Sequence, residues 1–192
     1  MTDRVCFFQA VRSDQPPTEQ SLTSVEYDRR VPTVRVVAST SVPPGRVLEA
    51  ARDFSERRAE VFPAVSIDHM TVHALADTSA DVTEGTAAGI GVNWERCQYD
   101  WSQPGAVTAT VIDSNVYAFP GSSWQLRAVP SGEGSEVEMT WERKFQRRPR
   151  GMFWGTLFAL LGKPIFGKYA KDVLANLEGL EKGTAPESPA AG

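Results

Sequence analysis

The sequence predicts a two-layer α+β domain, in which a curved, seven-stranded antiparallel sheet closes over one long C-terminal helix. Two observations lead to this prediction. Short segments of alternating apolar and polar residues follow one another between turn-forming residues, a pattern typical of antiparallel hairpins. Over residues 152–181 the apolar spacing then changes to the three- and four-residue period of a helix.

The length and composition indicate an ordinary globular domain. The chain has 192 residues, of which 41% are hydrophobic and 23% charged, and this length suits one domain. The formal net charge of -4 argues against nucleic acid as the main partner, because neutralising phosphates requires a basic face. The two cysteines, Cys6 and Cys97, offer no disulfide or metal framework and are typical of a reducing, cytoplasmic setting.

No segment of the sequence suggests an integral membrane protein. The N-terminus lacks the apolar run of a signal peptide, and the longest apolar stretch, residues 152–161, is well short of the ~20 residues that span a bilayer. We therefore expect a cytoplasmic protein. Residues 1–30 are expected to form a loosely ordered extension, residues 31–182 the domain, and residues 183–192 a disordered tail.

Turn residues divide the domain into its elements. A β-branched run predicts the first strand at residues 34–41, and Pro43 and Pro44 then start a short helix. Ser55 is expected to cap a second short helix, which Pro63 ends. Six further strands are predicted at residues 65–76, 81–88, 92–102, 106–117, 122–129 and 135–146.

Alternation predicts which side chains point inward. In the last strand Val137, Met139, Trp141, Arg143 and Phe145 share one face, opposite a charged and polar face. In the fourth strand the more apolar face carries Glu95, Cys97, Tyr99 and Trp101, although the neighbouring Trp94 leaves its direction open. The same period places Asp113 beside Val107 and Val111, and Trp124 beside Leu126 and Ala128.

The C-terminal helix has two dissimilar halves. Its second half is amphipathic, with a stripe that includes Phe166, Tyr169 and Val173. Its first half is apolar nearly all round, which predicts burial against more than one surface or lining of a cavity. Pro164 is expected to kink or split the helix near Gly162, and the first half would then act as a movable lid.

Four segments carry a resemblance to a known superfamily. They are Val34–Pro44 (VRVVASTSVPP), Gly105–Val111 (GAVTATV), Gly134–Trp141 (GSEVEMTW) and Leu174–Glu178 (LANLE). Together with the order of elements over residues 31–181, they resemble the START-related lipid-transfer domains, polyketide cyclases and birch-pollen-allergen-like proteins, the SRPBCC superfamily. The run from Trp94 to Trp101 resembles a bacterial branch of this group. The resemblance implies a helix-grip fold.

The resemblance also implies a function. Members bind lipids, sterols or polyketides in a cavity between the sheet and the long helix, and some cyclise or dehydrate the bound molecule. Three hypotheses follow: a binding or transfer module for a small hydrophobic molecule, a cyclase, aromatase or dehydrase, and a protein-interaction domain that has lost its cavity. The expected ligand contacts are Glu95, Tyr99, Trp101, Asp113, Trp124, Met139, Trp141, Arg143, Phe158, Leu161, Phe166 and Tyr169.

The polar candidates each have two interpretations. Arg143 would meet a ligand carboxylate or enolate, or pair with an internal acid, since burying an unpaired guanidinium is costly. Glu95 would act as a desolvated general acid or base, or be that internal partner. Tyr99 lines the pocket or belongs to the core, and Asp113 orients a ligand carbonyl or begins a loop.

No metal or cofactor is expected. His69 and His73 fall in a strand, where four residues span about 13 Å, too far to share one ion. Gly85, Gly89 and Gly91 form no dinucleotide fingerprint. A basic loop (Lys144, Arg147, Arg148 and Arg150) would face an anionic membrane or lipid headgroup, or be a solvated loop. Transient membrane contact therefore stays open, and the sequence predicts no oligomeric state.

Overall fold

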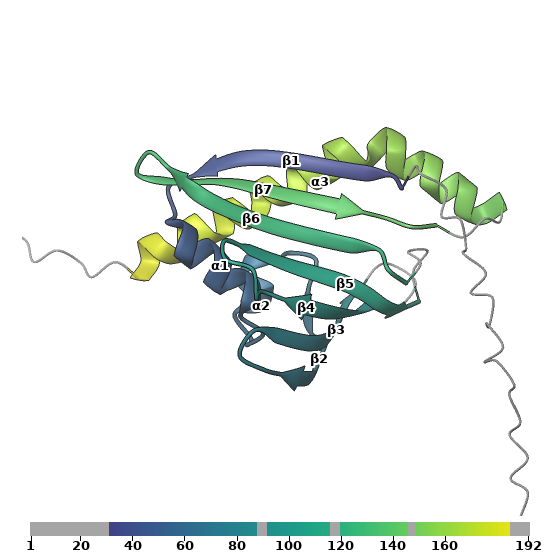
Figure 1. The fold of residues 1–192 in the computed structure, drawn as a ribbon, viewed down its shortest axis with the longest axis horizontal. Coiled ribbons are helices and arrows are strands. Elements are labelled where there is room, and N and C mark those ends of the chain that lie inside the picture. Colours follow the sequence, from purple (N-terminus) through teal and green to yellow (C-terminus); the bar gives the residue numbers. More distant parts are fainter. Residues whose placement is uncertain (1–30, 88–91, 116–119, 146–148, 185–192) are drawn as a thin grey trace, which may run out of the picture.

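The structure is a computed structural model that describes residues 31–87, 92–115, 120–145 and 149–184. The described strands form one antiparallel sheet in the order β1-β7-β6-β5-β4-β3-β2, shown in Figure 1. The elements are β1 (Thr33–Thr40), α1 (Pro44–Arg52), α2 (Arg58–Val61), β2 (Ser66–Leu75), β3 (Ser79–Ala87), β4 (Val92–Asp100), β5 (Ala106–Ser114), β6 (Ser123–Ser131), β7 (Gly134–Glu142) and α3 (Pro149–Thr184).

This arrangement confirms the predicted fold. Strands β2 to β7 form a meander, and β1 pairs with β7 along the full length of β1. The long helix α3 crosses one face of the curved sheet and packs against β1, while α1 packs against β6 (Figure 1). Because the helices cover only one face, the core lies between them and the sheet.

The inward face of the sheet is the one that alternation predicted. Val137, Met139 and Trp141 of β7 are buried, whereas Glu136 and Glu142 are exposed. In β4 the buried residues are Cys97 and Tyr99, so the face whose direction the sequence left open points toward the helices. Period-two alternation thus places the side chains of both strands correctly.

Two details of the helices differ from expectation. The helix α2 begins at Arg58 rather than next to Ser55, because the Ser55 hydroxyl accepts the Arg57 N–H, at 3.3 Å, and closes a turn before the helix. The helix α3 continues through Pro164 without a break, so the predicted split is wrong. Pro164 is exposed on α3, where the helix tolerates it despite the loss of one backbone hydrogen bond.

The first half of α3 is also far less buried than its composition predicted. Met152, Phe153, Leu160 and Ile165 are all more than half exposed. The face that does contact the sheet includes Gly162, where an added Cβ would lie 2.7 Å from the Val34 Cγ2 atom. The absence of a side chain at Gly162 therefore lets the helix approach β1 closely.

A β-bulge explains why Asp113 does not share the inward face. The pairing of β4 with β5 shifts register, so that Cys97 is opposite Val111 but Arg96 is opposite Asp113. One extra residue in β5 reverses the direction of the side chains beyond it. Asp113 is consequently exposed, and its carboxylate accepts the Ser114 N–H at 2.8 Å.

The end of β1 is joined to α3 through Glu178. Its Oε1 atom accepts hydrogen bonds from the Thr40 hydroxyl, at 2.7 Å, and from the Ser41 N–H, at 3.1 Å. These bonds stabilise the ionised carboxylate and lower the pKa of Glu178. The contact ties the C-terminal end of α3 to the loop that leads into α1.

Glu178→Gln is expected to lower the free energy of unfolding by about 1 kcal/mol at neutral pH, because a neutral amide accepts these bonds more weakly. The pKa of Glu178 is lower in the folded state, so the carboxylate's contribution is present above the unfolded pKa of about 4.3 and is lost as the pH falls through the folded value. Urea unfolding across this pH range measures it. A difference that stays constant with pH, or that equals the effect of changing the exposed Glu56 to Gln, contradicts it.

Some predictions concern residues that the structure does not describe. The extension over residues 1–30, residues 185–192, and Arg147 and Arg148 of the basic loop all lie outside the described ranges. Within those ranges, no helix is both long enough and apolar enough to cross a membrane.

Candidate functional site

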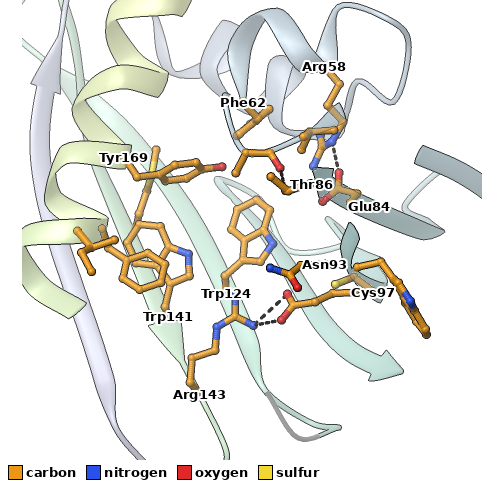
Figure 2. Close-up of a pocket in the computed structure, with 17 residues that line it drawn as sticks. Arg58, Phe62, Glu84, Thr86, Asn93, Cys97, Trp124, Trp141, Arg143 and Tyr169 are labelled. Atoms are coloured by element: carbon orange, nitrogen blue, oxygen red, sulfur yellow. Dashed lines mark hydrogen bonds and ion pairs between the residues drawn. The ribbon is translucent and has the colours of Figure 1, made fainter. Parts of the chain in front are cut away.

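A cavity of about 370 Å³ lies between the inner face of the sheet and the helices α2 and α3. Its walls come from α2 and the loop after it, from β3, β4, β6 and β7, and from the middle of α3 (Figure 2). The lining residues are Arg58, Phe62, Ala64, Val65, Glu84, Thr86, Asn93, Trp94, Glu95, Cys97, Trp124, Met139, Trp141, Arg143, Ile165, Phe166 and Tyr169.

Aromatic rings form most of the apolar wall. Trp141 lies with its ring centroid 4.6 Å from that of Phe166 and 6.2 Å from that of Tyr169. Trp124 extends into the cavity from β6 (Figure 2) and contacts Tyr99 edge to face at 6.0 Å. Such rings supply large apolar contact areas with few rotatable bonds, so the wall is both apolar and stiff.

One ion pair faces the cavity from the sheet. The Nη1 atom of Arg143 donates to both carboxylate oxygens of Glu95, at 2.9 and 3.1 Å, and the two side chains are only 15% and 23% exposed. Arg143 follows β7 and Glu95 belongs to β4, so the pair spans the sheet between them. The structure therefore shows the internal pairing that was one of the two sequence interpretations of these residues.

A second charged cluster lies on the other side of Trp124 (Figure 2). Arg58 is buried, with its side chain 1% exposed, and its guanidinium pairs with Glu84. It also donates to the Tyr99 hydroxyl at 3.0 Å, and Tyr99 in turn donates to Glu84 at 2.7 Å. Each member of this triad is thus hydrogen-bonded to both others, which offsets the cost of burying the charge.

Arg58 also joins α2 to the end of α1. Its Nη1 atom donates to the carbonyl oxygens of Ala51, at 3.1 Å, and Asp53, at 3.2 Å. These carbonyls lie at the C-terminal end of α1, where a helix leaves its last acceptors unsatisfied. Phe54 and Phe62 pack on the guanidinium, with ring centroids 4.5 and 4.6 Å away. Arg58 therefore connects α2 with the end of α1 and with strands β3 and β4.

The remaining titratable groups near the cavity are held neutral. Burial raises the pKa of the Tyr99 hydroxyl, and Glu84 raises it further. Burial likewise raises the pKa of Tyr169 and of the Cys97 thiol. These three groups therefore keep their protons at neutral pH, and Cys97 is an inert apolar wall residue rather than a nucleophile.

The cavity brings together seven of the twelve predicted contact residues. These are Glu95, Trp124, Met139, Trp141, Arg143, Phe166 and Tyr169. All seven were predicted from the same two patterns, the alternation of β4, β6 and β7 and the apolar stripe of α3. Their role as ligand contacts stays a prediction.

Five predicted residues do not line the cavity. Tyr99 is fully buried behind it, and the Trp101 indole donates to the Asp77 carbonyl at the other end of β4. Asp113 is turned outward by the bulge. Phe158 packs on Phe145 and Phe166, and Leu161 is 45% exposed on α3.

Sequence reasoning missed the wall formed by α2 and β3. In α2 a usable signal exists, because Arg58, Val61 and Phe62 have the spacing of one helical face. The sequence offers a weaker signal for Glu84, which shares its face of β3 with Val82. The pairing of Arg58 with Glu84 joins two segments that no local pattern connects.

Three exposed lining residues mark the mouth of the cavity. They are Ala64 after α2, Asn93 at the start of β4 and Ile165 on α3. The other lining residues are at least partly buried. The mouth is thus framed by one residue from each of three separate elements. Within the part of the chain that the structure describes, no group of acidic, histidine or cysteine side chains could hold a metal ion.

The chain is similar in fold to several solved structures. One is the Zhui aromatase/cyclase from a Streptomyces species, with a TM-score of 0.62 and 11% identity, covering 83% of this chain and 98% of that one. A START superfamily protein from Mycobacterium smegmatis has a TM-score of 0.59 and 12% identity, with coverage of 79% and 99%. The ginseng major latex-like protein 151 from Panax ginseng has a TM-score of 0.54 and 10% identity, with coverage of 77% and 95%.

At identities this low, the likeness shows the fold and leaves activity open. The chain has the helix-grip fold, which is the fold that the sequence resemblance implied. Comparison with protein-family models and with curated proteins finds no match.

Proposed function

We propose that the cavity binds one small, largely apolar molecule. The observation that carries this proposal is the cavity itself: about 370 Å³ of space walled by Trp, Phe and Tyr rings. Ligand sites typically measure roughly 300–1,000 Å³ and combine apolar walls with a few polar groups. The hypothesis of an interaction domain without a cavity predicted a smaller space than this.

The charges in the wall favour a neutral ligand over an anionic one. Arg143 and Glu95 already neutralise each other, so a ligand carboxylate beside Arg143 would add a second negative charge next to Glu95 in a partly buried place. A ligand hydroxyl or carbonyl can instead hydrogen-bond to the existing pair. We therefore propose a hydrophobic molecule with a single uncharged polar group directed toward Arg143.

Binding is favoured over catalysis for the same reason. The Zhui aromatase/cyclase shares the fold, but Glu95 and Arg143 are bound to each other rather than left as a separate acid or base. The proposed ligand is a lipid, a sterol-like compound or a polyketide. A cytoplasmic location stays a prediction.

Ala64→Trp tests this proposal at the mouth. Ala64 is exposed and lines the cavity, so a bulky ring there is expected to cover the opening without disturbing the core. We expect the affinity for the neutral fluorescent probe N-phenylnaphthylamine to fall by about tenfold or more, equivalent to ~1.4 kcal/mol. The measurement is a fluorescence titration of the full chain.

Ala175→Trp is the matched control, because Ala175 is exposed on α3 and does not line the cavity. It is expected to leave the probe affinity unchanged. If the parent protein fails to bind the probe with a stoichiometry near one, or if both variants bind like the parent, the cavity is not the binding site.

A further inference from the structure

Two side chains of the cavity wall carry N–H groups that the protein leaves unused. Arg143 gives only its Nη1 atom to Glu95, at 2.9 and 3.1 Å, and within the ranges that the structure describes its Nε and Nη2 atoms have no acceptor. The indole Nε1 atom of Trp141 has no acceptor there either. Since every fully enclosed side-chain nitrogen among the described residues has a partner, these donors are reached from accessible space.

The accessible space beside both donors is the cavity. Trp141 and Arg143 belong to its wall, at successive inward positions that lie about 7 Å apart along an extended chain. Trp141 as a whole is only 4% exposed. Figure 2 shows its indole nitrogen on the side of the ring that faces Trp124 and the Arg143 guanidinium. The two donors therefore serve one region of the cavity.

The unused donors make a demand on any ligand that fills this region. A ligand that enters displaces the water that such N–H groups otherwise bind. An N–H that is enclosed without any acceptor costs free energy, and orphan donors of this kind are rare in proteins. A ligand that presents only hydrocarbon to Trp141 and Arg143 therefore binds at a penalty, which an acceptor oxygen on the ligand removes.

We infer that the polar group of the ligand is a carbonyl oxygen, as in a ketone, ester or amide, which accepts from the Trp141 indole and from a free N–H of Arg143. This inference rests on the proposed function and names the chemical class of its ligand. A carbonyl oxygen has two lone pairs and no proton, so it accepts both bonds and needs no acceptor in return. Trp141 and Arg143 thus determine the specificity of the cavity.

Other polar groups fit the same place less well. The proton of a ligand hydroxyl needs an acceptor, and Glu95, the acceptor beside Arg143, already receives the Nη1 atom on both of its oxygens. A ligand carboxylate adds a second negative charge next to Glu95. An uncharged acceptor without a proton of its own is the group that remains.

Trp124 is a contrasting case. Its indole N–H also has no acceptor among the residues that the structure describes. Figure 2 shows this nitrogen on the side of Asn93, an exposed residue at the mouth of the cavity. Water can stay bound to the Trp124 N–H there when a ligand is present, so this donor makes no demand on the ligand.

Three naphthalenes that are substituted at the same ring position test the inference. They are acetylnaphthalene, a ketone; naphthylethanol, the corresponding alcohol; and ethylnaphthalene, which has no polar group. Equilibrium dialysis against the full chain measures the affinity of each, and we expect the ketone to bind the parent most tightly. The ratio of the ketone's affinity to that of ethylnaphthalene should fall about tenfold in Trp141→Phe, which keeps an aromatic ring but lacks the N–H.

Arg143→Lys is the second variant, because it keeps a positive charge beside Glu95 but replaces the guanidinium fork by an ammonium group. It is expected to lower the same ratio. Infrared spectra give a further readout: the isotope-labelled carbonyl of bound acetylnaphthalene should absorb at a lower frequency in the parent than in Trp141→Phe. Trp101→Phe is the matched control, since the Trp101 indole donates to the Asp77 carbonyl at 2.8 Å and lies outside the cavity. Its ratio should equal the parent's.

The possible results separate this inference from the proposed function. An affinity ratio that is the same in the parent, Trp141→Phe and Arg143→Lys overturns the inference, while binding of the naphthalenes still supports an apolar binding cavity. An alcohol that binds more tightly than the ketone also overturns it, because Glu95 would then receive the ligand's proton. A parent protein that binds none of the three overturns the inference and the proposed function together.

Discussion

Replacing Arg58 by methionine is expected to lower the free energy of unfolding by about 3–5 kcal/mol, the usual loss when one partner of a buried ion pair is removed. The change leaves Glu84 charged beside an apolar side chain, and it removes a donor from the Tyr99 hydroxyl. The carbonyls of Ala51 and Asp53 also lose their hydrogen-bond donor. Urea unfolding measures the change.

Arg57→Met is the control, since Arg57 is the adjacent, exposed arginine, and an exposed substitution usually changes stability by within about 0.5 kcal/mol. Adding Glu84→Gln to Arg58→Met should recover part of the loss, because the second change removes the stranded charge. Equal free energies of unfolding for Arg57→Met and Arg58→Met would show that the contacts of Arg58 with Glu84 and Tyr99 do not hold α1 and α2 to the sheet.

Replacing Trp141 by alanine is expected to lower the free energy of unfolding by about 3–5 kcal/mol, as large-to-small changes of buried tryptophans do. Trp141 is 4% exposed and contacts Phe166 and Tyr169 of α3. Its loss removes these two ring contacts between the end of β7 and the helix and enlarges the cavity, whose wall includes Trp141. Thermal and urea unfolding of the two proteins measure this effect.

Indole is expected to restore part of the stability that the Trp141→Ala variant loses. Because the variant gains an apolar hole next to the cavity, excess indole is expected to raise its melting temperature more than that of the parent. Trp101→Ala is the control, since Trp101 is only partly buried and lies outside the cavity, and indole should not rescue it selectively. Equal stabilisation of all three proteins would show that indole does not enter the space left by Trp141.

The sequence predicted the sheet well because each strand carries its own signal. The alternation of β7 sufficed to bury Met139 and Trp141, and the same period in β4 placed Glu95 on the face where it meets Arg143. Their pairing was anticipated because a charge on an inward face needs a partner. These predictions depend only on the period of a strand, which is a local property.

The errors arose where local pattern does not determine the outcome. The direction of Asp113 depends on a bulge in the pairing of β5 with β4, which shows only when both strands are aligned. Tyr99 lies on the predicted inward face of β4, but its place behind the cavity depends on its hydrogen bond to Arg58 of α2, a segment that no local pattern connects with β4. Leu160 and Leu161 are exposed because they lie off the face of α3 that contacts the sheet, the face that includes Gly162, whereas the composition of the helix alone predicted burial.

Native mass spectrometry of the full chain, titrated with N-phenylnaphthylamine, tests the central claim most directly. The cavity predicts a complex of one probe molecule per chain in the parent protein and in Ala175→Trp, and little or none in Ala64→Trp. An apolar molecule that co-purifies with the parent should be displaced by the probe. A parent protein that carries no bound molecule and takes up none, or an Ala64→Trp variant that binds one as the parent does, would contradict the account.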